Sequence, residues 1–138
     1  MLSELTPEDL VDMDQCRARV GDMVKSRTFL SLKRTPSDLR LLQKVIDERG
    51  RHGPMSRRDY RCMGVCFGDV LASVSPLRWV MVNDEHGRDP TLRWNDTSVQ
   101  INATWMILKR IMADEPVDLA ALAAQTLRVA RERAALEE

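Results

Sequence analysis

Residues 76–101, PLRWVMVNDEHGRDPTLRWNDTSVQI, decide the fold that we expect for this chain. Within this stretch, β-branched and aromatic residues gather in three short runs, which is typical of strands. The runs cover residues 77–82, 91–94 and 98–101. The residues between them, rich in Asn, Asp and Gly, have the composition of turns. The stretch therefore predicts a small three-stranded antiparallel meander.

On both sides of the meander, apolar residues repeat with the spacing of amphipathic helices. The predicted helices cover residues 7–25, 36–49, 57–74, 104–113 and 119–136. Thr6, Thr35 and Ser56 stand at N-cap positions with an acid three residues later, which favours a helix start at each. The sequence thus predicts an α+β fold in one domain, residues 1–138, with three helices before the meander and two after it.

Composition narrows the classes of protein to consider. The 138 residues include 21 Lys and Arg against 21 Asp and Glu, so the formal net charge is zero. This balance gives no broad electrostatic reason to bind nucleic acid or an anionic membrane. No run approaches the roughly 18 apolar residues of a membrane span. The N-terminal residues are acidic and do not resemble a secretory signal.

The three cysteines are Cys16, Cys62 and Cys66. An odd number without a clear framework favours a reducing compartment, so we expect a cytoplasmic protein. Cys62 and Cys66 are four residues apart in a predicted helix, where their Cβ atoms lie roughly 5–6 Å apart, too far for a disulfide. We therefore expect free thiols.

Gly64 and Gly68 interrupt the apolar stripe of the third predicted helix. Each glycine destabilises a helix interior by about 1 kcal/mol relative to alanine. Close approach of another backbone would explain both positions, and simple tight packing is the alternative.

The chain lacks the common motifs for chemistry. Its cysteines and histidines do not have the paired spacing of a zinc site, and the acids after Asp84 do not follow an EF-hand. Two catalytic alternatives stay open, namely a cysteine paired with His52 and an acid–base pair of Asp84 and Asp89. The basic residues between Arg49 and Arg61 fit a solvated loop better than a nucleic-acid site. We predict no catalytic residue, cofactor or metal.

Charged residues around the meander are the remaining candidates. Because charges near a sheet are normally paired, we expect Asp84, Arg88, Asp89, Arg93, Lys109 and Arg110 to hold the turn onto the helix of residues 104–113. Tryptophan alternation would place one ring outward, and an outward Trp94 would mark an interface. The candidate interaction or structural residues are Trp79, Asp84, Arg88, Asp89, Arg93, Trp94, Lys109 and Arg110.

Several motifs occur in a familiar order: LLQ at 41–43, FGDVL at 67–71, WVMVND at 79–84, GRDP at 87–90, MILKR at 106–110 and EPVD at 115–118. Over about residues 36–120 the chain resembles a small, mostly bacterial domain family that is catalogued as a domain of unknown function. The resemblance implies the fold of that family and no particular reaction, ligand or catalytic residue.

Two functional hypotheses follow. The first is a non-enzymatic protein-interaction module of the bacterial cytosol, such as an immunity or adaptor protein that binds a toxin or effector. The second is a small enzyme or small-ligand-binding protein that uses the acidic turn from Asp84 to Asp89 with Lys109 and Arg110. An exposed apolar patch around Trp94 would favour the first, and a deep pocket lined by Asp84, Asp89 and Arg110 the second.

Overall fold

Residues 1–137, the part of the chain that the computed structural model describes, fold into a four-stranded antiparallel sheet and five helices. The sheet order is β1-β2-β3-β4. The elements in chain order are β1 (Leu2–Ser3), α1 (Pro7–Thr28), α2 (Asp38–Asp47), α3 (Arg57–Ser73), β2 (Leu77–Asp84), β3 (Gly87–Trp94), β4 (Gln100–Ile101), α4 (Ala103–Met112) and α5 (Leu119–Ala135). The predicted α+β class is confirmed, and the predicted strands need correction.

The hairpin of β2 and β3 is longer than the sequence predicts. The two strands pair along their whole lengths, from Leu77 opposite Trp94 to Asp84 opposite Gly87. Residues 83–90, predicted as a turn, therefore belong mostly to strands, and Gly87 closes the hairpin with a φ of 112° that favours glycine. A fourth strand, β1, was missed because two residues are too short to show any alternation.

Side-chain caps fix the starts of three helices. At α1 and α3, Thr6 and Ser56 each exchange hydrogen bonds with the acid three residues later, as predicted. Asp118 caps α5. The prediction of a helix start at Pro36 was wrong, because α2 begins at Asp38. The Asp38 carboxylate instead accepts hydrogen bonds from backbone amides of the preceding loop, so residues 35–37 form a turn.

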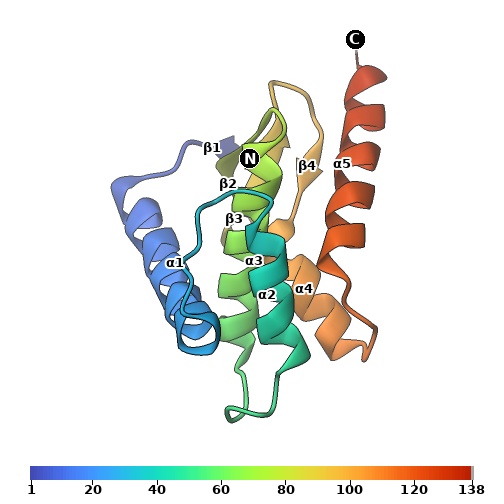
Figure 1. Ribbon diagram of the computed structural model, residues 1–138. Helices are drawn as coiled ribbons and strands as arrows, with labels where there is room; N and C mark the ends of the chain where they lie inside the picture. Colours follow the sequence, from blue (N-terminus) through green and yellow to red (C-terminus); the bar gives the residue numbers. More distant parts are fainter. Residues whose placement is uncertain (138) are drawn as a thin grey trace.

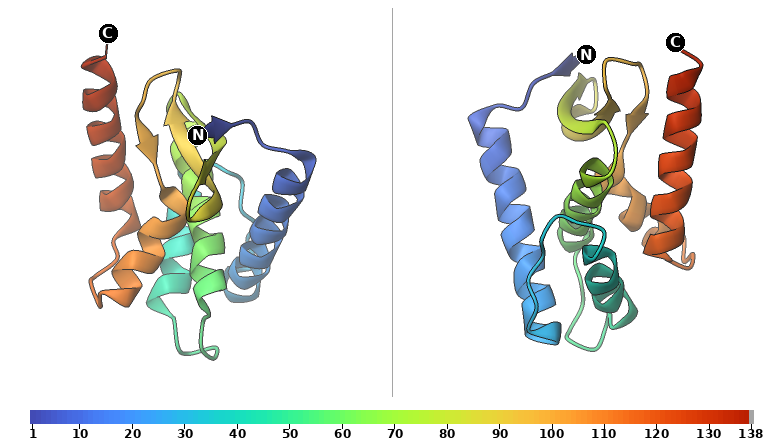
Figure 2. Two further views of the ribbon diagram at one scale, coloured as in Figure 1. Left: turned by 180° about the vertical axis from the view of Figure 1, so that it is seen from behind. Right: turned by 45° about the horizontal axis from the view of Figure 1, so that its top comes forward.

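Helix α3 is the centre of the molecule, and α1 and α5 stand on its opposite flanks (Figures 1 and 2). The helix packs closely against α4 at Gly64 and against Trp79 of β2 at Gly68. A Cβ atom on Gly64 would lie 2.6 Å from the Thr104 Cα and carbonyl oxygen, and one on Gly68 would overlap the Trp79 ring. The predicted close approach of another backbone is confirmed at Gly64.

Polar and covalent bonds fasten α1 to α3. Arg17 donates two hydrogen bonds to the buried Asp69 carboxylate, at 2.7 and 2.8 Å. Cys16 and Cys62 form a disulfide with their Cα atoms 4.6 Å apart, so the expectation of three free thiols was wrong. Residue spacing excludes a disulfide only between cysteines on one helix, whereas the packing of two helices joins this pair. Cys66 remains a free, buried thiol.

None of the helices within residues 1–137 has both the length and the apolar character that crossing a membrane requires.

Candidate functional site

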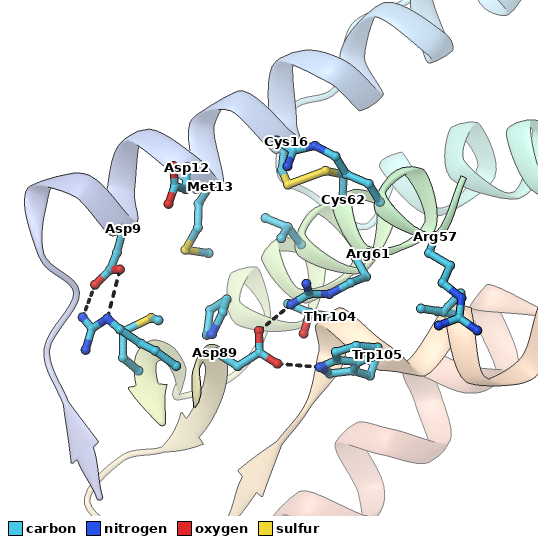
Figure 3. Close-up of a pocket in the computed structure, with 16 residues that line it drawn as sticks. Asp9, Asp12, Met13, Cys16, Arg57, Arg61, Cys62, Asp89, Thr104 and Trp105 are labelled. Carbon is cyan, nitrogen blue, oxygen red and sulfur yellow. Dashed lines mark hydrogen bonds and ion pairs between the residues drawn. A yellow bond between two sulfur atoms is a disulfide. The ribbon is translucent and has the colours of Figure 1, made fainter. Parts of the chain in front are cut away.

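Asp89 lies at the centre of the charged residues that the sequence singled out. From β3, its carboxylate accepts a hydrogen bond from the Arg61 guanidinium of α3 and another from the Trp105 indole N–H of α4, the latter at 2.6 Å. The Arg61 guanidinium also stacks over the Trp105 ring, 4.4 Å from its centroid. Figure 3 shows these side chains, which we call the Arg61–Asp89–Trp105 cluster, meeting between three elements.

Arg88 is the neighbouring point of contact between sheet and helix. Its guanidinium pairs with Asp9 in the first turn of α1 and donates to the Asn83 side-chain oxygen at 2.8 Å. The hydrogen bond from Arg88, together with those from Thr6, holds the pKa of Asp9 below its ordinary value. At neutral pH the Asp9 carboxylate is therefore ionised and already paired with Arg88.

The other predicted charges do not join this network. Arg93 donates to the backbone carbonyls of Thr97 and Asp96, so it stabilises the turn between β3 and β4. Asp84 accepts the backbone N–H of His86 within its own hairpin. Within residues 1–137, no ion pair involves Lys109 or Arg110.

The two predicted tryptophans belong to the interior. Trp79 is half-buried and donates its indole N–H to Asp69 at 3.0 Å. Trp94 is only 8% exposed and packs in the core, so it does not face outward, and the exposed patch around it that would have favoured an interaction module does not exist among residues 1–137. Alternation along a strand predicts that two faces exist, and it does not say which face another layer covers.

Two adjoining hollows, which we call the groove, meet at the Arg61–Asp89–Trp105 cluster. The first part of the groove is a hollow of about 640 Å³ between α1, α3, β3 and α4. Apolar side chains and the disulfide line this hollow, among them Met13, Val65 and Leu108. Arg57, Arg58 and Asp12 stand at its edges. Figure 3 shows α1, with Asp12, across from α3, with Arg57 and Arg61.

The second part of the groove is a hollow of about 580 Å³, and the lining residues that it shares with the first are Arg61, Arg88, Asp89, Pro90 and Trp105. Asp84 and Lys109 line it, and Arg110 does not. The two hollows therefore adjoin at the Arg61–Asp89–Trp105 cluster, with Arg57 and Arg58 lining the first and Lys109 lining the second.

Arg57 and Arg58 differ from the other arginines of the groove. Arg61 and Arg88 are each neutralised by an aspartate. In the described part of the chain, no ion pair or side-chain hydrogen bond involves Arg57 or Arg58, and both are exposed. The sequence patterns placed these residues at the start of a predicted helix, treated the basic stretch from Arg49 to Arg61 as solvated, and did not single out Trp105. Their helical spacing, with Arg61 one turn after Arg57 and Arg58, was the available signal.

Asp9 on α1, which lines the groove, and Cys66 on α3, which does not, both have shifted pKa values. Asp9 is a weak base because its pKa is lowered. Burial raises the pKa of the Cys66 thiol to about 12, so this thiol is not a nucleophile at neutral pH. No three metal-binding side chains of residues 1–137 come together in a way that could hold a metal ion.

Comparisons with known proteins place the chain in a family and identify its fold. The family model described as Domain of unknown function (DUF3806) matches residues 38–122, so the chain belongs to that family. No curated protein matches the chain. A crystal structure from Bacteroides thetaiotaomicron shares the fold with a TM-score of 0.82 over 92% of this chain, at 18% sequence identity. The chain spans 47% of the length of that protein.

Proposed function

We propose that this chain is a non-enzymatic binding module and that the groove along the Arg61–Asp89–Trp105 cluster receives a segment of a partner protein. The unpaired arginines Arg57 and Arg58, at the edge of a hollow with an apolar floor, carry the proposal. Pockets of 300–1,000 Å³ with apolar walls and a few polar groups are typical binding sites. Two hollows that adjoin at one cluster give room for a continuous segment of chain.

The walls of the groove are held in place from several sides. The Cys16–Cys62 disulfide joins the two helices of the first hollow, and the Arg61–Asp89–Trp105 cluster joins α3, β3 and α4. The close contact at Gly64 fixes α3 against α4. A site with fixed walls loses little conformational entropy on binding, which favours affinity. An immunity or adaptor protein that binds a toxin or effector is one form that such a module takes.

A second candidate is a protein that binds a small ligand in the second hollow. The lining of that hollow by Asp84, Asp89 and Lys109 favours this candidate. Arg110, which the small-ligand hypothesis also required, lies outside the lining. The Asp84 carboxylate already accepts a hydrogen bond within its own turn.

The cytoplasmic location was expected because all three cysteines were expected to be free thiols. The Cys16–Cys62 disulfide removes that argument, since disulfides are typical of oxidising compartments.

Blocking the groove tests the binding role. Asp12→Trp puts a large ring at the edge of the first hollow without touching the arginines, and Glu132→Trp makes the same change on the exposed surface of α5. Each protein, immobilised, is exposed to a lysate of the organism that encodes it, and retained proteins are quantified by mass spectrometry. We expect a protein retained by the wild type and by Glu132→Trp to be lost with Asp12→Trp. Equal retention by all three proteins contradicts the proposal.

A further inference from the structure

The charges of the groove point to the chemistry of its ligand. Resting on the binding role proposed above, we infer that the partner segment is acidic: its carboxylates pair with Arg57 and Arg58, and an apolar side chain beside them covers Trp105 and Leu108.

The charge balance of the first hollow is the first observation. Its lining holds four arginines and three aspartates. Asp89 neutralises Arg61 and Asp9 neutralises Arg88, which leaves Arg57 and Arg58 facing a hollow in which Asp12 is the remaining acid. The first hollow, with four arginines against three aspartates, therefore has an excess of one positive charge in a chain that is neutral as a whole. An anionic ligand matches that excess.

The position of the two arginines is the second observation. They occupy the first two positions of α3, directly after the Ser56 N-cap. The N-terminal turn of a helix favours acids and disfavours cations, because the helix dipole is positive there. The Ser56–Asp59 capping box already satisfies backbone amides of this turn. Neither the helix nor its caps therefore explain arginines at these positions, whereas binding a carboxylate does.

The floor between the two charged edges is the third observation. Met13, Val65 and Leu108 are buried, and Trp105 is partly exposed where the two hollows meet. A guanidinium binds a carboxylate through two parallel hydrogen bonds and fixes its orientation. An apolar residue next to an acid in the partner would then lie on this floor. Lys109 gives the second hollow a further cation without an ion-pair partner among residues 1–137.

Nucleic acid fits the groove less well than an acidic peptide. Asp9, Asp12, Asp84 and Asp89 all line one or both hollows. A phosphate backbone carries a charge at every nucleotide and would meet these carboxylates along its path. A peptide places acids at chosen positions and can put neutral side chains elsewhere.

Selection from a random-peptide display library tests the inference. The immobilised proteins are the wild type, the variant Arg57→Gln/Arg58→Gln, and the matched control Arg128→Gln/Arg131→Gln on the exposed face of α5. We expect peptides selected by the wild type and by the α5 control to be enriched in Asp and Glu over the starting library. The best peptide should bind the groove variant about tenfold more weakly and should lose affinity as salt rises.

The opposite outcomes separate this inference from the binding role. If the selected peptides are blocked by Asp12→Trp but are neutral or basic, or bind Arg57→Gln/Arg58→Gln as tightly as the wild type, the groove is a binding site and the acidic ligand is wrong. If Asp12→Trp leaves peptide binding unchanged, the groove itself is the wrong site. Tighter binding of a single-stranded oligothymidylate than of the best acidic peptide also overturns the inference.

Discussion

Asp89 shows what a single residue does in this structure. Its carboxylate accepts hydrogen bonds from Arg61 and from Trp105, so one side chain ties β3 to both α3 and α4. The sequence predicted a structural role for Asp89 but pointed to partners nearby, at Arg93, Lys109 and Arg110. The actual partners depend on how the helices pack on the hairpin, which local sequence patterns do not contain.

Replacing Asp89 tests this tie. Asp89→Ala leaves the Arg61 guanidinium and the Trp105 indole without this acceptor. Because the pair is partly exposed to solvent, which weakens its contribution, we expect the free energy of unfolding to fall by only about 1–2 kcal/mol. Asp89→Asn keeps an acceptor and should lose less. Chemical denaturation measures both variants. An unchanged midpoint for Asp89→Ala would show that the carboxylate does not hold the three elements together.

Two helical glycines should respond oppositely to the same change. Gly64→Ala forces a methyl group against the Thr104 backbone, so we expect a loss of about 1–3 kcal/mol or more, despite the better helix propensity of alanine. At Gly21 in α1, no atom beyond its chain neighbours and the adjacent backbone of its own helix lies within 4 Å of the place that an added methyl group would take, so Gly21→Ala should stabilise by up to about 1 kcal/mol. Thermal melts compare them. Equal effects at the two positions would contradict the close contact of α3 and α4.

The tryptophans show the limit of residue patterns. Alternation predicted that one tryptophan of the meander would face outward, and Trp94 was the candidate. The structure buries Trp94 and leaves Trp105, on a helix, partly exposed at the groove. Trp94 stands in a predicted strand and Trp105 in a predicted helix, and neither pattern says which ring another element covers, so only tertiary packing separates the core ring from the surface ring.

At the scale of elements, the sequence predicts what local chemistry determines. The capping residues Thr6 and Ser56 marked two helix starts correctly, because a cap acts within a few residues. At α2 the Asp38 side chain bonds to the preceding loop, which shifts the start past Pro36. Strand β1 forms only because Leu2 and Ser3 reach Val82 and Met81, a pairing across most of the chain.

The bond between α1 and α3 gives a prediction in thiol chemistry. Because Cys16 and Cys62 form a disulfide and Cys66 is 3% exposed, the folded protein should show no thiol that reacts with Ellman's reagent at neutral pH. Burial, with a smaller contribution from the Asp69 charge, raises the pKa of Cys66 to about 12 and keeps it protonated. Unfolding without a reductant should expose one thiol. Three reactive thiols after unfolding would contradict the disulfide.

The whole molecule should lose stability in acid. Arg88 lowers the pKa of Asp9 below its ordinary value of 3.8. Burial opposes the charge of Asp59, but hydrogen bonds from Ser56 and Arg19 outweigh it and lower its pKa from the same value. A carboxyl whose pKa is lower in the folded state stabilises that state above the unfolded pKa. That contribution is lost as the pH falls through the folded pKa.

We therefore expect the free energy of unfolding to be steady from neutral pH to about pH 5 and to fall below about pH 4. Urea denaturation at several pH values measures this fall. Asp59→Asn should be less stable at neutral pH and should show a shallower decline in acid. The same slope for the wild type and the variant would mean that Asp59 does not have a lowered pKa.

Across the whole molecule, our central claim is that Arg57 and Arg58, which line the groove without an ion-pair partner among residues 1–137, bind an acidic segment of a partner protein. The three tryptophans report on this claim separately, since Trp105 borders the groove while Trp79 bonds to Asp69 and Trp94 packs in the core. The most direct measurement is a titration with the best selected acidic peptide, followed by NMR of the three indole N–H signals. We predict that the Trp105 signal and the Arg57 and Arg58 amides shift while the Trp79 and Trp94 signals stay. An unchanged Trp105 indole signal, or chemical-shift changes that centre on α5, would contradict the claim.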